Sequence, residues 1–169
     1  MSAFYEYFKN IDGKTAFLAG LVSTLADQTL CEILPKYWAV EADIFEANKD
    51  NLVSSIKERM RKYDSEISGL IDNLQFEIVE STVDFEQMTH SLFDSYKCNH
   101  SDKESECIKY FLSGSCLQIG DIKALYRLKE PLSDECERCF SQFYTYVVFD
   151  IFFIQYSNYI VMVVFGSDE

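Results

Sequence analysis

Apolar side chains recur at three- and four-residue steps along the first part of the chain, which is the spacing of one helix face. This spacing predicts two helices between residues 3 and 38. Asn10, Asp12 and Gly13 form the break between them. Pro35 ends the second helix because its ring disfavours continuing one. The small pair Ala19 and Gly20 predicts close packing of the second helix against a neighbour.

Helical spacing continues through the middle of the chain. Residues 41–63 predict one or two helices, and residues 64–96 predict a long helix with one apolar stripe, eight carboxylates and no lysine or arginine. Shorter helices, each begun by a Ser or Asp that can cap it, are predicted over residues 103–112, 121–128 and 133–143. Gly114 is expected to end the first of these short helices.

The pattern changes near the C-terminus, where β-branched and aromatic residues form two runs around the polar pair Ser157 and Asn158. These runs predict a β-hairpin with strands over residues 147–156 and 159–165. The expected fold is a single α+β domain over residues 1–169, mostly helical, with the C-terminal antiparallel hairpin lying on the helices. An all-α fold is the alternative, because an aromatic-rich apolar run can also form a buried helix.

Charge narrows the classes of partner. The chain has 28 acidic and 15 basic residues, a formal charge of -13. Nucleic acid and anionic membranes are poor partners for such a chain, because both attract Lys and Arg. A basic protein is the expected partner, although the acidity could also serve only solubility.

Two features bear on location. The first residues lack the basic region and apolar run of a signal peptide, so we expect a cytoplasmic protein. Residues 143–165 are apolar, but Asp150 within them would cost about 3 kcal/mol near a bilayer centre, so we expect no membrane span.

Residues that could carry chemistry are few. The only histidines are His90, expected near Glu86 or Asp94, and His100. The six cysteines are expected to be reduced thiols, and the alternative to that is a zinc site formed by Cys98, His100, Cys136 and Cys139. No nucleotide-binding, hydrolase or kinase motif is present, so we expect a binding protein without a cofactor. An enzyme of unrecognised type is a further alternative.

The closing segment DIFFIQYSNYIVMVVFGSDE, together with the small acidic helical character of the chain, resembles small bacterial immunity proteins of contact-dependent inhibition and polymorphic toxin systems. The resemblance implies a cytoplasmic antitoxin that covers the active site of one cognate toxin. A cationic nuclease domain is the toxin that fits the acidic charge. A small zinc-binding regulatory module is the alternative function, and the oligomeric state stays open.

The candidate contacts to the toxin are carboxylates. Helical spacing places Glu77, Glu80 and Asp84 on one face of the predicted acidic helix, where like charges gain from meeting cations. A solvated face is the structural explanation of the same pattern. The full candidate set is Asp72, Glu77, Glu80, Asp84, Glu41, Asp43 and Glu46.

Overall fold

The structure is a computed structural model that describes residues 13–34, 36–47, 52–63, 75–79, 87, 90, 103–129 and 148–167. Its helical elements are α2 (Gly13–Thr29), the 3₁₀ turn η1 (Leu30–Ile33), α3 (Leu52–Tyr63) and α6 (Glu104–Ile119). Its strands are β1 (Trp38–Glu46), β2 (Phe76–Val79), β3 (Ala124–Leu128), β4 (Val148–Gln155) and β5 (Tyr159–Ser167).

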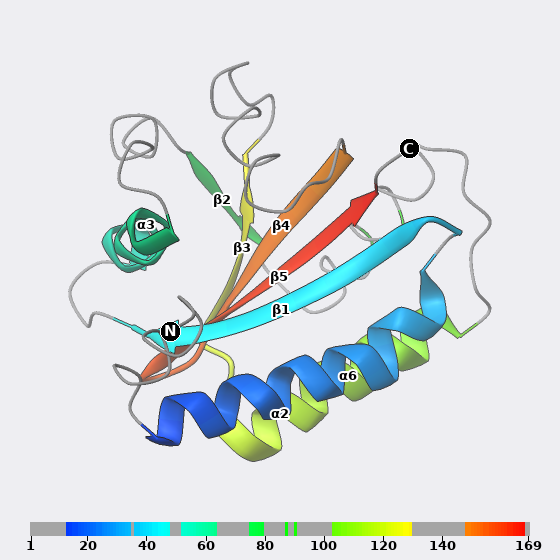
Figure 1. Cartoon of the computed structure of the whole chain (residues 1–169), viewed down its shortest axis with the longest axis horizontal. Helices are drawn as coiled ribbons and strands as arrows, with labels where there is room; N and C mark the ends of the chain where they lie inside the picture. The colour runs from blue at the N-terminus through cyan, green and yellow to red at the C-terminus, as the bar shows by residue number, and fades with distance from the viewer. Residues whose placement is uncertain are drawn as a thin grey trace, which may run out of the picture.

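The five strands form one antiparallel sheet in the order β1-β5-β4-β3-β2 (Figure 1). The hairpin of β4 and β5 lies inside this sheet and is flanked by β1 on one side and β3 on the other. The chain turns between them at Ser157 and Asn158, and Tyr156 closes the turn by donating its amide to the carbonyl of Tyr159 at 2.8 Å.

Both faces of the sheet are covered, which explains why the hairpin is apolar at nearly every position. α2, η1 and α6 pack on one face, against a core that includes Phe152, Ile154 and Val163. α3 packs on the other face, where Ile56 joins Ile151 and Phe153. Strands buried on both sides lose the alternation of apolar and polar residues that marks a half-exposed strand.

Edge-to-face aromatic pairs strengthen both layers of the core. Phe152 and Phe165 lie 6.0 Å apart, centroid to centroid, on the face covered by α2 and α6. Phe76 and Phe153 lie 5.5 Å apart on the α3 face, and this pair ties the short strand β2 to the centre of the sheet. Each such pair contributes about 0.5–1.5 kcal/mol to stability in addition to the contribution from the apolar area that it buries.

The prediction of a mostly helical fold with one hairpin is wrong. Residues 41–46, 76–79 and 124–128 were expected to be helical, and each belongs to a strand. Pairing across the sheet overrides local helix propensity in these segments, because apolar residues on them are buried against neighbouring strands. The all-α alternative fails for the same reason, whereas the predicted hairpin is present, with strands close to the expected ends.

The helices also depart from expectation in detail. α6 continues through Gly114, and Gly120 caps its C-terminal end. Gly120 has a φ of 120°, and its amide donates a hydrogen bond to the carbonyl of Cys116 at 2.9 Å. η1 ends before Leu34, which is extended, the conformation favoured by a residue that precedes proline. In the part of the chain that the structure describes, no helix is long and apolar enough to cross a membrane.

Candidate functional site

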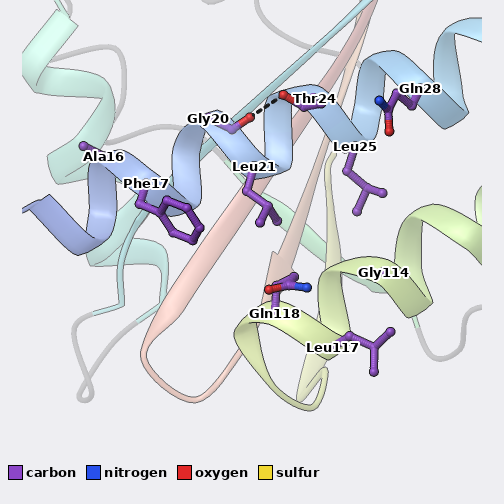
Figure 2. A pocket seen from close by; sticks show the side chains of 10 residues that line it. All are labelled: Ala16, Phe17, Gly20, Leu21, Thr24, Leu25, Gln28, Gly114, Leu117 and Gln118. Atoms are coloured by element: carbon purple, nitrogen blue, oxygen red, sulfur yellow. Dashed lines mark hydrogen bonds between the residues drawn. The ribbon is translucent and has the colours of Figure 1, made fainter.

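The outer surface of the helical layer contains a groove between α2 and α6 with a volume of about 670 Å³ (Figure 2). The two helices run antiparallel, since Leu25 of α2 lies against Gly114 of α6, while Glu32, just beyond α2, pairs with Lys103, just before α6. The lining residues are Ala16, Phe17, Gly20, Leu21, Thr24, Leu25, Gln28, Gly114, Leu117 and Gln118.

The groove is shaped by two glycines that play different parts. A Cβ atom on Gly114 would come within 3.0 Å of Leu25 Cδ2, so this glycine lets α6 approach α2 closely. A Cβ atom on Gly20 would meet nothing within 4 Å. The predicted close packing is therefore wrong at Gly20, whereas Ala19 packs against the core, and the close approach of α6 to α2 occurs at Gly114.

Apolar side chains on the groove are exposed to an unusual degree. Phe17 is 66% exposed and Leu117 is 85% exposed, while Leu21 and Leu25 are partly buried between the helices. Figure 2 shows Phe17, Leu21 and Leu25 directed from α2 toward α6. Exposed apolar residues gathered around a groove are typical of a surface that binds another molecule, whereas isolated ones are common and need no explanation.

Exposed carboxylates lie toward the Gln28 end of the groove, but none of them lines it. Asp27 directly precedes Gln28 on α2, Glu32 follows it by four residues in η1, and Glu106 lies on α6, one turn before Tyr110. Glu32 pairs with Lys103 at 3.6 Å, and Glu106 accepts a hydrogen bond from the Tyr110 hydroxyl at 3.0 Å.

The titration of neighbouring groups reflects these carboxylates. Burial and then the charge of Asp27 raise the pKa of the Cys31 thiol, and burial and then the charge of Glu32 raise the pKa of Cys107. The hydrogen bond to Glu106 is the main cause that raises the pKa of Tyr110. A nearby carboxylate contributes to each of these raised pKa values, although burial is the larger cause for both thiols.

The structure describes four of the carboxylates predicted to contact a partner. Glu41 and Glu46 are exposed on β1, whereas Glu77 lies on β2 and pairs with Arg127 of β3 at 3.9 Å. Because residues 76–79 form a strand, the prediction of a shared helix face for Glu77, Glu80 and Asp84 is wrong at Glu77. Three of the predicted residues lie outside the described part of the chain: Asp72, Glu80 and Asp84.

Asp43, the fourth of these carboxylates, has a structural role within the protein. One carboxylate oxygen accepts the amide of Ile44 at 2.8 Å, and the other accepts the Nε of Arg59 on α3 at 3.0 Å. The side chain of Arg59 is only 11% exposed. The pair therefore connects α3 to the edge strand β1.

A second charged cluster is buried in the sheet. The Nε of Arg127 donates to Asp150 Oδ2 at 2.8 Å, and the Asp150 side chain is 2% exposed. The guanidinium of Arg127 also lies 6.0 Å from the centre of the Phe152 ring. Since Asp150 Oδ1 accepts the amide of Ile151 at 2.9 Å, the carboxylate is held by both backbone and side chain. This arrangement explains a charged residue within the apolar hairpin.

Histidine and cysteine chemistry is limited in the described residues. His90 Nδ1 lies 3.2 Å from Glu104 Oε2, and the neighbours expected for it, Glu86 and Asp94, lie outside the described residues. Cys31, Cys107 and Cys116 are free thiols, and the residues that the structure describes contain no group of three potential metal ligands. The proposed zinc set, Cys98, His100, Cys136 and Cys139, lies outside the described residues.

The surplus negative charge has a definite origin. The described residues contain eleven carboxylates and eleven lysines or arginines, which balance. The charge of -13 therefore comes from the remaining segments, mainly residues 64–74, 80–102 and 130–147. The described residues, which include the groove, are therefore neutral overall.

Sequence reasoning did not single out the groove. Phe17 and Leu21 were included in an apolar stripe expected to be buried, and Leu117 lay beyond the expected end of its helix. One signal was available: α2 carries apolar residues on more of its circumference than a helix with one buried face requires. Comparisons of the chain with protein-family models, curated proteins and solved structures return no match, so function is inferred from its own geometry and charge.

Proposed function

We propose that this chain is an immunity-type binding protein, which acts in the cytoplasm by holding one basic partner protein in an inactive complex. The observation that carries the proposal is the exposed apolar groove between α2 and α6, with Phe17 and Leu117 on its rim. A non-catalytic role fits the chemistry available, since the groove is lined by apolar, Thr and Gln side chains and contains no nucleophile paired with a base.

Net charge supports a basic partner. A charge of -13 attracts cationic proteins over distances of about 10 Å at moderate salt and accelerates their association. A toxin that acts on nucleic acid carries Lys and Arg at its active site, so it would be attracted in this way. The resemblance of the closing segment Asp150–Glu169 to immunity proteins points in the same direction.

The test is capture of the tagged protein from cells of its native strain, and with the product of the adjacent upstream gene, followed by mass spectrometry. We expect one basic protein domain in stoichiometric amount, and we expect growth arrest caused by that domain to be cancelled on co-expression. A captured domain whose toxicity is unaffected by this chain would refute the immunity role. Recovery of the chain alone with bound zinc would favour the regulatory module.

A further inference from the structure

The floor of the groove restricts the kind of segment that can bind in it. Its backbone belongs to α2 and α6, whose amides and carbonyls are bonded within the helices. An extended peptide laid across this floor would leave its own backbone groups without partners as it became buried, at a cost of several kcal/mol. A helix satisfies its own backbone and can bind through side chains alone.

The side chains around the groove specify the character of such a helix. Phe17, Leu21 and Leu117 line the groove with apolar surface toward one end, and Asp27 and Glu32 are exposed just past its lining toward the other end. A ligand helix needs apolar residues spaced at three and four positions, followed by Lys or Arg about two turns along. Two antiparallel helices also present ridges and a groove into which a third helix can pack.

We propose that the α2–α6 groove binds an amphipathic helix of the partner protein, with its apolar face on Phe17, Leu21 and Leu117 and a Lys or Arg beside Asp27 and Glu32. That the partner is a toxin rests on the proposed function. That the bound segment is an amphipathic helix rests on the groove alone. A second copy of the chain fits less well, because two molecules of charge -13 repel each other and exposed carboxylates lie close to one end of the groove.

The test uses a displayed library of helical peptides of about 18 residues, selected on the full-length protein. Selected peptides are then synthesised, and their Kd values are measured by fluorescence anisotropy. We expect enrichment of apolar residues at i, i+3 or i+4, and i+7 with Lys or Arg near one end. Leu117→Glu should weaken binding at least tenfold, and Asp27→Lys should weaken it about threefold to tenfold.

Ile78→Glu is the matched control, because Ile78 is 66% exposed on β2 and the change in side chain is similar. It should leave peptide binding unchanged. The proposal fails if no helical consensus is enriched, if Leu117→Glu and Ile78→Glu act alike, or if sedimentation shows a dimer that Leu117→Glu dissociates.

The two proposals can fail separately. Peptide selection needs no toxin, so a groove that selects basic amphipathic helices stands even if capture yields no toxic domain. Conversely, if the chain protects cells and Leu117→Glu protects them equally well, the immunity role stands and the groove is not its interface.

Discussion

At the scale of single residues, the buried polar groups show how a charge is accommodated in an apolar hairpin. Asp150 is held by Arg127 and by the amide of Ile151, whereas Glu77 approaches the same arginine from a more exposed position. Removing one partner of a buried pair leaves an uncompensated charge, and removing an exposed partner changes little. The two carboxylates around one guanidinium are therefore expected to differ greatly in their contribution to stability.

Asp150→Asn should lower the free energy of unfolding by about 3 kcal/mol, because Arg127 loses its buried counter-charge while the amide of Ile151 keeps an acceptor. Glu77→Gln should cost less than about 1 kcal/mol, since the Glu77 side chain is 39% exposed. Urea unfolding of both variants measures the difference. Equal losses would show that Asp150 is not the principal partner of Arg127.

Tyr156 offers a second test at this scale. Its hydroxyl donates to Ser115 Oγ at 2.6 Å, and burial raises the pKa of this tyrosine well above its ordinary value of 10.0. The unfolded tyrosine ionises first, so the contribution is fully present below about pH 10 and is lost as the pH rises further, at up to about 1.4 kcal/mol per pH unit.

Tyr156→Phe should cost about 1 kcal/mol at pH 7, where the hydrogen bond is lost. Above pH 10, its stability should decline less steeply than that of the unchanged protein, so the two curves converge. Unfolding in urea from pH 7 to pH 11 measures both effects. Parallel curves above pH 10 would contradict the assignment of this pKa shift to the buried hydroxyl.

At the scale of elements, the helical layer depends on which glycine faces the neighbouring helix. Gly114 allows the contact with Leu25, and Gly20 lies on an open surface. Both residues are within helices, where glycine is less favourable than alanine by about 1 kcal/mol. At Gly20, helix propensity favours alanine and no packing contact opposes it. At Gly114, helix propensity also favours alanine, but packing against Leu25 opposes the added methyl group.

Gly20→Ala should stabilise the protein by about 0.5–1 kcal/mol, because the added methyl group meets no atom and helix propensity improves. Gly114→Ala should gain less, or lose stability, because Leu25 must move to admit the methyl group. Thermal unfolding of the pair provides the measurement. A larger gain at Gly114 than at Gly20 would show that α2 and α6 are not closely packed there.

At the scale of the whole molecule, the described residues are neutral overall and the surplus negative charge lies in the rest of the chain. We therefore expect the charge and the groove to act on different steps of binding. The surplus charge acts at long range and affects the rate of encounter, while the groove acts only on contact and affects the lifetime of the complex. Variants of the groove and changes of salt should therefore alter different rate constants.

For the partner obtained by capture, raising the salt concentration from 0.05 M to 0.5 M should lower the association rate constant by about tenfold or more, with a smaller effect on dissociation. Leu117→Glu should act mainly by accelerating dissociation. Surface plasmon resonance resolves the two constants. An association rate independent of salt would remove electrostatic steering from the proposed mechanism.

Several features could be predicted from the sequence because they depend on neighbours along the chain. The helix at residues 13–29, the helix at residues 52–63 and the hairpin turn at Ser157 and Asn158 all follow from local spacing and turn chemistry. The segments 41–46, 76–79 and 124–128 were misread, because their apolar residues fit the helical spacing of the sequence around them. Their pairing partners lie from 25 to 123 residues away, as Arg127 with Phe152 and Glu41 with Val164 show.

The sequence by itself determined the net charge, the two-sided apolar character of the hairpin and the positions of the main helices, since each is a property of composition or local order. Only the tertiary structure decided that Asp43 and Glu77 are paired within the protein, that the buried Asp150 pairs with Arg127, and that Phe17 and Leu117 border an open groove. Exposure and ion pairing depend on which distant segments meet. Helical spacing shows that a residue shares a face with others, but not whether that face is covered.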